Sequence, residues 1–270
     1  MIERLKTGLL IVIVAYGFIC TLLYFLQESL LFYPSKLASD YQFEFTGSFK
    51  EVNLETSDGS VLNGVLFSSS KKKGVVLFLH GNGGAIHRWG QGASIYTENG
   101  YDVFYIDYRG YGKSEGKITS EKQLINDGQV AYNYLKQHYP EAQIIVSGTS
   151  IGTGIATQVA AQNNPMKLIL NAPYYSLLSL VKEKVRLIPS FIVKYKLSTV
   201  NYVKEVKCPI VIFHGVEDAI IPHQHTLQLK SSHPSIKVEL IKHYGHNDLF
   251  QSVEYIRKMS AVLKNEINEF

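Results

Sequence analysis

The sequence predicts an α/β protein in which helices cover both faces of a mostly parallel central sheet, preceded by one hydrophobic helix. Three observations lead to this prediction. Short, continuous apolar runs alternate with segments of helical periodicity, as parallel strands alternate with the helices that connect them. One of these runs leads through a glycine-flanked serine, Ser150, directly into a helical segment. A stretch without charged residues, Gly8–Leu26, stands ahead of the alternation.

The composition is that of a globular chain with one additional hydrophobic segment. The 270 residues are enough for one large domain with a full core. Apolar residues make up 46% of the chain, charged residues make up 19%, and the formal net charge is +4. This charge is too small to indicate nucleic-acid binding, and no basic stripe interleaved with aromatic residues occurs. The two cysteines, Cys20 and Cys208, cannot form a disulfide framework.

The apolar stretch Gly8–Leu26 is just long enough to cross a hydrocarbon core of about 30 Å as a helix. A cleaved signal peptide is one alternative, but its hydrophobic part is usually shorter, and no small-x-small cleavage site follows. Cys20 lacks the small preceding residue that a lipoprotein signal requires. A buried helix of the globular domain is another alternative, although the stretch lies outside the fold pattern that follows. We therefore expect residues 1–27 to be a retained membrane anchor.

The charges that flank this stretch indicate its orientation. Arg4 and Lys6 precede it and Glu28 follows it. Because positive residues favour the cytoplasmic side, we expect a single-pass membrane protein with a cytoplasmic N-terminus and the remaining domain on the opposite side. Residues 28–50 then form a linker, and residues 51–270 form the globular domain.

The strands of this domain are recognised by apolar runs bounded by turn residues. Asp58-Gly59 predicts a hairpin between the first two strands. The expected strands are Glu51–Thr56, Val61–Ser69, Gly74–His80, Tyr101–Tyr108, Gln143–Ser147, Lys167–Ala172, Cys208–Phe213 and Lys237–Ile241. The expected helices are Ser120–Tyr139, which Pro140 ends, Thr153–Ala161 and Leu249–Asn268.

Residues 174–204 interrupt the alternation of strands and helices. They mix apolar and aromatic positions with basic ones, and Pro189 divides them. We expect a small helical cap inserted over the carboxyl edge of the sheet. One hypothesis is that this cap is a lid over an apolar pocket and that its basic residues touch lipid. The alternative is an ordinary amphipathic helix with a solvated basic face, and this alternative is favoured over direct membrane contact. These basic residues are Lys182, Lys184, Arg186, Lys194 and Lys196.

The segment Gly148–Gly152 has the sequence Gly-Thr-Ser-Ile-Gly and joins an expected strand to an expected helix. G-x-S-x-G in this context is typical of a nucleophile elbow, in which a tight, strained turn lifts the serine hydroxyl above the sheet. A Cβ at either glycine would collide with a neighbouring element, and the helix N-terminus favours negative charge. The alternative is a glycine-rich turn with a solvent-facing serine. The flanking strand and helix favour Ser150 as a candidate nucleophile.

A second glycine-rich turn, His80–Gly84, follows the strand Gly74–His80. Unobstructed backbone N–H groups in such a turn can form half of an oxyanion hole, with Asn82 as the first donor and Ile151 as the second. The alternative is a phosphate-binding or merely tight turn. A P-loop is excluded because no Gly-Lys-Ser/Thr follows.

An acid and a histidine follow the last two strands, where active sites of open α/β sheets form. Asp218 is the candidate acid; Glu217 is its neighbour, and an N-cap is the alternative role of Asp218. His246 is the candidate base, because it precedes the last helix and completes the order Ser, acid, His; His243 is its competitor and lies nearer the strand. We expect no metal site at the His223 and His225 pair, which do not share a helix face.

From about residue 51 onward, the chain resembles the α/β-hydrolase superfamily. The motifs HGNGG, DYRGYGKSEG, GTSIG, HGVEDAIIP and GHND occur in the order typical of that family. The anchor, LLFYPSK and GHND together resemble a subgroup of single-pass membrane serine hydrolases, the Bem-type and α/β-hydrolase-domain-containing proteins, which includes protein depalmitoylases and lipid or lysophospholipid hydrolases. The resemblance implies Ser150 as nucleophile, Asp218 as acid, His246 as base, and Asn82 and Ile151 as backbone oxyanion donors.

These roles predict a serine hydrolase that cleaves an ester or thioester of an acyl substrate close to a membrane, through an acyl-enzyme and without metal or organic cofactor. The substrate could be a lipid or an acylated protein. A peptidase or amidase is the alternative within the family. A non-catalytic binding protein of the same fold is the alternative outside it, and the presence of all three triad residues disfavours that reading.

Overall fold

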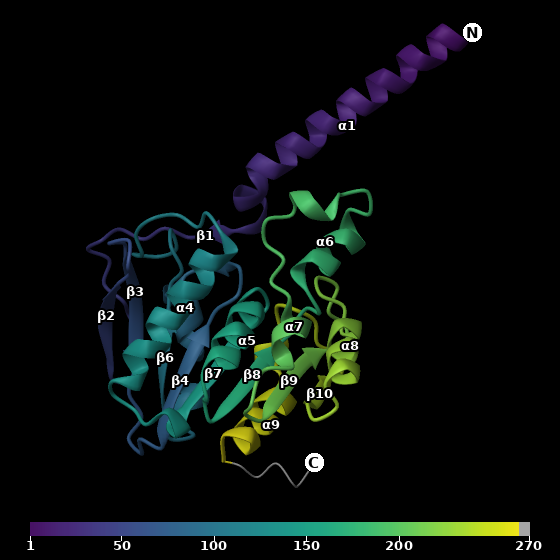
Figure 1. Cartoon of the computed structure of the whole chain (residues 1–270). Coiled ribbons are helices and arrows are strands. Elements are labelled where there is room, and N and C mark those ends of the chain that lie inside the picture. Colours follow the sequence, from purple (N-terminus) through teal and green to yellow (C-terminus); the bar gives the residue numbers. More distant parts are fainter. Residues whose placement is uncertain (265–270) are drawn as a thin grey trace.

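A central sheet of eight strands organises the chain, which a computed structural model describes for residues 1–264 (Figure 1). The strands are β2 (Phe49–Glu55), β3 (Val61–Phe67), β4 (Gly74–Leu79), β6 (Tyr101–Ile106), β7 (Ile144–Thr149), β8 (Lys167–Asn171), β9 (Ile210–Gly215) and β10 (Lys237–Ile241). Their order is β10-β9-β8-β7-β4-β6-β3-β2. The pairs from β10 to β6 are parallel, whereas β3 is antiparallel to both β6 and β2. The predicted mostly parallel sheet and the predicted hairpin between β2 and β3 are therefore confirmed.

Nine helices are present in residues 1–264, and all except α1 lie between or after the strands of the sheet. They are α1 (Ile2–Leu31), α2 (Ile86–Trp89), α3 (Ser94–Thr97), α4 (Glu121–Lys136), α5 (Gly152–Gln162), α6 (Leu177–Lys184), α7 (Thr199–Val203), α8 (Gln224–Ser232) and α9 (Val253–Lys264). Short 3₁₀ turns span Gly90–Gly92, Glu141–Gln143, Ser190–Ile192 and Leu249–Gln251.

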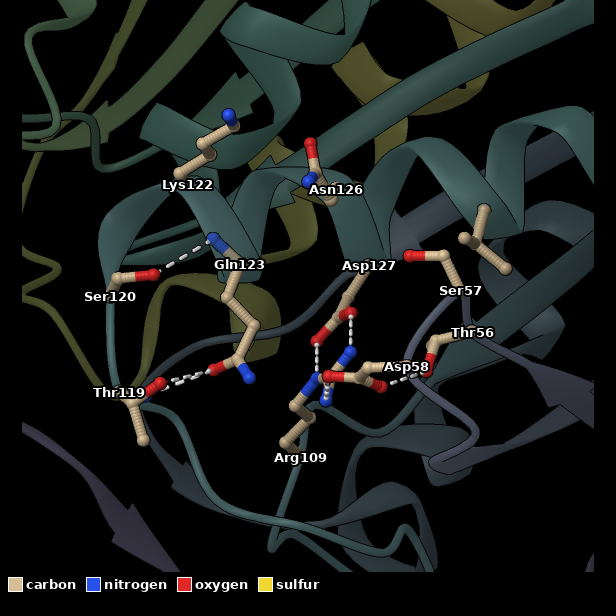
Figure 2. A pocket seen from close by; sticks show the side chains of 11 residues that line it. Thr56, Ser57, Asp58, Arg109, Thr119, Ser120, Lys122, Gln123, Asn126 and Asp127 are labelled. Carbon is tan, nitrogen blue, oxygen red and sulfur yellow. Dashed lines mark hydrogen bonds and ion pairs between the residues drawn. The ribbon is translucent and has the colours of Figure 1, made fainter.

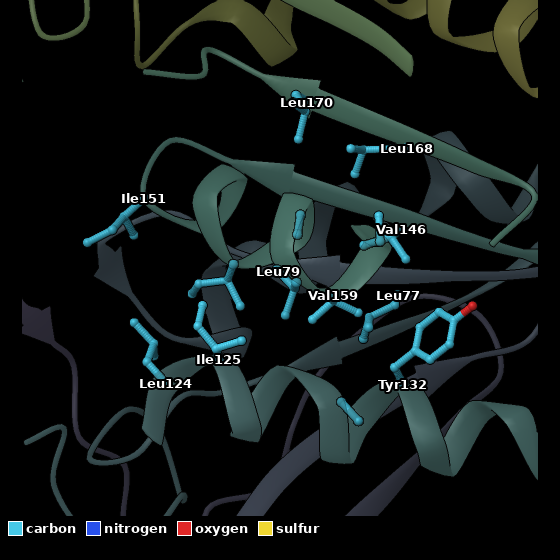
Figure 3. Packing of buried hydrophobic residues seen from close by; sticks show 14 of the residues in the cluster. Leu77, Leu79, Leu124, Ile125, Tyr132, Val146, Ile151, Val159, Leu168 and Leu170 are labelled. Atoms are coloured by element: carbon cyan, nitrogen blue, oxygen red, sulfur yellow. The ribbon is translucent and has the colours of Figure 1, made fainter. Parts of the chain in front are cut away.

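The central strands are apolar on both sides because both faces of the sheet are covered. Leu77 and Leu79 of β4 pack with α4 and α5 in one buried cluster (Figure 3). Val76 and Phe78 of the same strand pack with α2, α3 and α9 in a second cluster. This alternation follows from the two-residue period of a strand, and it explains why the continuous apolar runs predicted parallel strands.

Several boundaries differ from the expectations. The short helices α2 and α3 lie between β4 and β6, where the sequence predicted no helix; Gly90, Gly92 and Gly100 interrupt their apolar pattern. The expected last helix is divided at Ser252, whose extended backbone separates a 3₁₀ turn from α9. Its expected last turn, residues 265–268, lies outside the described residues.

Helix α1 projects away from the sheet and ends at Leu31 (Figure 1). The chain then forms a two-residue strand, β1 (Tyr33–Pro34), which pairs in parallel with β5 (Gly83–Gly84). The segment expected as a linker thus contains the end of α1 and a strand that contacts the turn after β4. Residues 174–204, the expected cap, contain α6, a 3₁₀ turn and α7; residues 192–194 contact the end of α1, whereas α7 packs beside α5 and α8 (Figure 1).

Candidate active site

Ser150 occupies a sharp turn between β7 and α5 and has a left-handed backbone conformation, with a φ of 53°. For a residue with a Cβ this conformation is strained by about 1–2 kcal/mol. The turn closes only because its flanks are glycines. A Cβ on Gly148 would lie 2.6 Å from the carbonyl oxygen of Gly152, and a Cβ on Gly152 would meet the carbonyl oxygen of Leu79. The turn therefore has the geometry that the G-x-S-x-G motif predicted.

His246 lies between Ser150 and Asp218. Its Nε2 is 2.9 Å from Oγ of Ser150, and its Nδ1 is 2.6 Å from Oδ2 of Asp218. Because an ionised carboxylate can only accept hydrogen bonds, Nδ1 carries the proton, and Nε2 is left as an acceptor for the serine hydroxyl. The structure thus brings together the three residues predicted as nucleophile, base and acid, from loops that follow β7, β10 and β9.

The carboxylate of Asp218 is fully buried and has more partners than the sequence indicated. Burial by itself raises the pKa of Asp218, but hydrogen bonds from His214 and His246 and from the Ile221 backbone N–H outweigh it and hold this pKa well below its usual range. Nε2 of His214 lies 3.3 Å from Oδ2 of Asp218, and the backbone N–H groups of Ile220 and Ile221 donate to Oδ1. Asp218 is therefore ionised and fixed in orientation.

The competing acid and base lie elsewhere. Glu217 and His243 are both exposed and face each other at 3.5 Å. His223 bonds the backbone of Val216, and His225 pairs with Glu183 of α6 at 3.1 Å. None of these four side chains contacts Ser150 or its two partners.

The two expected oxyanion donors are backbone groups on either side of Ser150. Within residues 1–264, the N–H groups of Asn82 and Ile151 have no hydrogen-bond partner, so they are available to a ligand. The side chain of Asn82 is held in place, because its Oδ1 accepts hydrogen bonds from Tyr111 Oη at 3.0 Å and from the Tyr33 backbone N–H at 3.3 Å. Gly81 leaves room for the indole ring of Trp89, since a Cβ there would lie 2.9 Å from Trp89 Cζ2.

A buried pair supports this turn from inside the domain. Nδ1 of His80 lies 2.6 Å from the carbonyl oxygen of Gly81, and Nε2 lies 3.3 Å from Oδ1 of Asp107. Burial raises the pKa of Asp107, against the opposing effect of the hydrogen bond from His80. The same Oδ1 accepts a hydrogen bond from the Ile86 backbone N–H, which ties the start of α2 to the turn.

A cavity of about 890 Å³ opens above Ser150 and His246. Its walls come from the turn after β4, from α6 of the cap and from the end of α1. Sequence reasoning did not predict that residues 31 and 33 would line it. The lining includes Leu31, Tyr33, Asn82, Arg88, Trp89, Tyr174, Leu177, Leu180, Ile220, Ile221 and Phe250. A mostly apolar cavity of this size is in the range of small-molecule binding sites.

A second, polar hollow of about 250 Å³ lies beside α4 and does not include the triad (Figure 2). Arg109 is nearly buried in its wall and forms a bidentate ion pair with Asp127, at 2.7 and 2.9 Å, and a single bond to Asp58 at 2.6 Å. The hydrogen bonds that Arg109 donates to Asp127 raise the pKa of Arg109, and the hydrogen bond that Arg109 donates to Asp58 lowers the pKa of Asp58. The guanidinium is therefore committed to joining the loop after β2 to α4.

Known proteins with similar sequences and structures carry the same fold. Residues 70–201 match a family model described as Hydrolase_4, serine aminopeptidase, S33. The chain is 31% identical over 222 residues to α/β-hydrolase domain-containing protein 17C of Xenopus tropicalis, covering 78% of this chain and 69% of that protein. It is 30% identical over 186 residues to putative α/β hydrolase L404 of Acanthamoeba polyphaga mimivirus, covering 66% of this chain and 68% of that protein.

Among solved structures, Pyrococcus furiosus esterase Pf2001 matches with a TM-score of 0.67 and 20% identity, covering 87% of this chain and 97% of that one. An α/β hydrolase from Vibrio vulnificus matches with a TM-score of 0.63 and 25% identity, covering 82% of this chain and 80% of that one. These structural matches establish a common arrangement of the sheet and its helices.

Proposed function

The chain belongs to the α/β-hydrolase superfamily, and from this premise we propose that it is a membrane-anchored serine hydrolase that cleaves a carboxylic ester or thioester of an acyl substrate. The observation that carries the proposal is the hydrogen-bonded chain from Ser150 through His246 to Asp218, at the floor of an apolar cavity. Among the described residues, Thr226, His214 and Asp218 are also in contact, but Thr226 and His214 are fully buried and do not line the cavity.

The reaction follows from this geometry. His246 Nε2 takes the proton of Ser150 as Oγ attacks the acyl carbonyl carbon, and Asp218 stabilises the imidazolium. The imidazolium then returns the proton to the leaving alcohol or thiol, and the acyl group remains on Ser150. A water that His246 deprotonates attacks this acyl-enzyme, and release of the acid restores the serine.

The developing oxyanion lies between two backbone donors. The Asn82 and Ile151 N–H groups are each expected to stabilise the transition state by about 3 kcal/mol. The start of α5 behind Ser150 contributes its favourable dipole end to the same charge.

An acyl substrate near a membrane is supported by the surroundings of the cavity. Helix α1 has a mean hydropathy of 2.6 over its most apolar window, none of which is buried against the domain. Its last turn and the residues after it line the cavity through Leu31 and Tyr33. In the cap, the side chains of Leu187 and Phe191 are 80% and 84% exposed.

The proposed membrane topology and domain division are those expected from the sequence. Residues 1–27 anchor the chain in a bilayer with a cytoplasmic N-terminus, residues 28–50 link the anchor to the domain, and residues 51–270 form the catalytic domain on the opposite side. The basic flank Arg4 and Lys6 supports this orientation.

The name of the matching family model raises a peptidase as the second candidate. An aminopeptidase has to bind the positively charged amino terminus of its substrate. Among the described residues, no aspartate or glutamate lines the cavity, whereas Arg88 does. The cavity therefore favours an uncharged or anionic acyl substrate over a free amino terminus.

The deciding experiment is labelling of the full-length protein with a fluorophosphonate probe, together with turnover of p-nitrophenyl esters and aminoacyl p-nitroanilides. Wild type is expected to label and to hydrolyse the esters, and Ser150→Ala is expected to do neither. Undiminished ester turnover by Ser150→Ala would exclude the proposed nucleophile. Faster hydrolysis of the anilides than of the esters would favour the peptidase.

A further inference from the structure

The chain between the apolar part of α1 and the first strand of the hairpin contacts both walls of the cavity. We call residues 27–37 the juxtamembrane segment. It begins in the last turns of α1, passes through β1 and ends beside the loop after β6.

On one side, this segment forms a strand against the turn that carries Asn82. Tyr33 pairs with Gly83, Pro34 pairs with Gly84, and the Ser35 N–H donates to the Gly84 carbonyl at 3.1 Å. The Tyr33 N–H donates to Oδ1 of Asn82 at 3.3 Å. The same turn is also held from the domain, where Tyr111 Oη donates to Oδ1 of Asn82 at 3.0 Å and Trp89 Nε1 donates to the Gly83 carbonyl at 2.8 Å.

The other edge of the segment is fixed to the body of the domain. The Gly112 N–H donates to the Ser35 carbonyl, and the Leu37 N–H donates to the Gly112 carbonyl, both at 2.9 Å. The segment therefore connects the turn that carries Asn82 with the loop after β6, as the middle strand of a small sheet would.

At its start, the segment holds the cap. Gln27 is buried although the rest of α1 is largely exposed. Its Nε2 donates to the Ile192 carbonyl at 2.7 Å, and its Oε1 accepts from the Lys194 N–H at 2.8 Å, so the amide pairs with cap backbone in both directions. Glu28 adds bonds from Lys194 Nζ at 3.2 Å and from Tyr195 Oη at 3.1 Å.

We infer that the juxtamembrane segment is a positioning element of the active site, which fixes the oxyanion turn through Ser35 and Tyr33 and the cap through Gln27 and Glu28. The inference rests on the proposed hydrolase function. It assigns to the anchor a role beyond membrane attachment, because the segment that continues the membrane helix contacts both the turn that carries Asn82 and the part of the cap that follows α6. An oxyanion donor acts only when it is aligned in advance, so loss of the strand pairing lowers the rate constant of the chemical step.

The first test is a matched pair of proline substitutions in the full-length protein in detergent micelles. Ser35→Pro removes the N–H that bonds Gly84, whereas no partner of the Lys36 N–H is present among residues 1–264, so Lys36→Pro is the control. We expect Ser35→Pro to lower kcat for p-nitrophenyl butyrate by about tenfold or more with little change in KM, and Lys36→Pro to stay within about threefold of wild type. Hydrogen exchange of the peptide that spans residues 80–86 is expected to accelerate only in Ser35→Pro.

The second test concerns the cap and uses a substitution outside the two hydrophobic clusters of the domain. Gln27→Ala is compared with Thr21→Ala, whose hydroxyl bonds only the Gly17 carbonyl of its own helix. We expect Gln27→Ala to raise KM for p-nitrophenyl palmitate by about fivefold while kcat for the butyrate ester is retained, and Thr21→Ala to match wild type.

The outcomes separate the inference from the proposed function. The Tm of each proline variant shows whether it is folded. If both are folded and have equal kcat and equal hydrogen exchange of residues 80–86, the inference that the segment fixes the oxyanion turn is overturned. If Ser35→Pro does not fold, the Gln27 pair decides, and identical KM values for Gln27→Ala and Thr21→Ala overturn the inference. A wild type that neither labels nor turns over would refute the hydrolase function, and the exchange of residues 80–86 would still decide whether the segment holds the turn.

Discussion

His246 and Asp218 are 28 positions apart in the chain, and their side chains meet at 2.6 Å at the carboxyl edge of the sheet. The contact exists because β9 and β10 are parallel neighbours, so the loops that leave them emerge side by side. It orients the imidazole toward Ser150 on the loop after β7, two strands further along the sheet.

Replacing this carboxylate is expected to disable the base rather than to unfold the protein. Asp218→Asn can donate to Nδ1 and stabilise the wrong tautomer of His246, so kcat for p-nitrophenyl butyrate should fall by about 10⁴-fold. Glu217→Gln is the matched control, because Glu217 is exposed and contacts only exposed His243. Similar rates for the two variants would show that Asp218 is not the acid.

The same carboxylate predicts how stability depends on pH. The pKa of Asp218 is well below its usual range in the folded state, since hydrogen bonds from His214 and His246 outweigh the effect of burial. Its ionised form therefore stabilises the fold above the ordinary pKa of about 4, and this stabilisation is lost as the pH falls below that value. Urea unfolding between pH 3 and pH 6 should show a steeper loss of stability at low pH for wild type than for Asp218→Asn. Parallel curves would contradict the assignment.

Strain at Ser150 predicts that one inactive variant is more stable than another. Ser150→Gly removes the Cβ that makes a φ of 53° costly, whereas Ser150→Ala keeps it. Both variants should be inactive. Relief of strain should make the free energy of unfolding of the glycine variant about 1 kcal/mol higher than that of the alanine variant, and the larger conformational entropy of glycine in the unfolded chain reduces this difference. Chemical denaturation of the two proteins measures this difference; a less stable glycine variant would argue against strain at this position.

Close packing of the turn predicts a large cost for a single methyl group. In Gly152→Ala, the new Cβ would meet the Leu79 carbonyl oxygen, so β4 and α5 must separate. We expect a loss of about 2–4 kcal/mol in the free energy of unfolding. Gly83→Ala is the control, because a Cβ there has nothing within 4 Å. Equal stabilities would mean that α5 can shift without cost.

The anchor predicts membrane retention that depends on the apolar face of α1. The full chain should remain with membranes after an alkaline carbonate wash. Ile13→Lys combined with Gly17→Lys places two charges in the apolar stretch, at about 2.5–3.5 kcal/mol each near the bilayer centre, and should release the protein. Gln42→Lys combined with Glu44→Lys, at exposed linker positions, should leave it bound. Release of wild type by the wash would exclude a transmembrane anchor.

Much of the fold could be predicted because the relevant signals are local. The apolar runs of β4, β7 and β8 follow from burial of both strand faces, and the turn at Ser150 is specified by Gly148 and Gly152, whose missing side chains let the chain bend. The hairpin between β2 and β3 follows from Asp58-Gly59. The division of the last helix at Ser252 was not predicted, because the apolar periodicity continues across it.

The site was predicted in its residue types and order, but not in its full set of partners. Nε2 of His214 lies 2.9 Å from the Ile221 carbonyl oxygen and 3.3 Å from Oδ2 of Asp218, and the only sequence signal was the place of His214 four residues before Asp218, near the end of β9. Leu31 and Tyr33 reach the cavity because β1 pairs with β5, a pairing between segments about 50 positions apart that no local periodicity indicates.

The sequence by itself determined the α/β architecture, the elbow at Ser150 and the apolar stretch of α1, because strand burial, turn sterics and helix length are properties of short segments. The order Ser, acid, His already favoured His246 over His243 in the sequence. Only the tertiary structure decided that a second histidine, His214, lies beside Asp218, and that the juxtamembrane segment contacts both the oxyanion turn and the cap. These contacts depend on the order of strands in the sheet and on which loops emerge together at its edge, and both are set by packing over the whole domain.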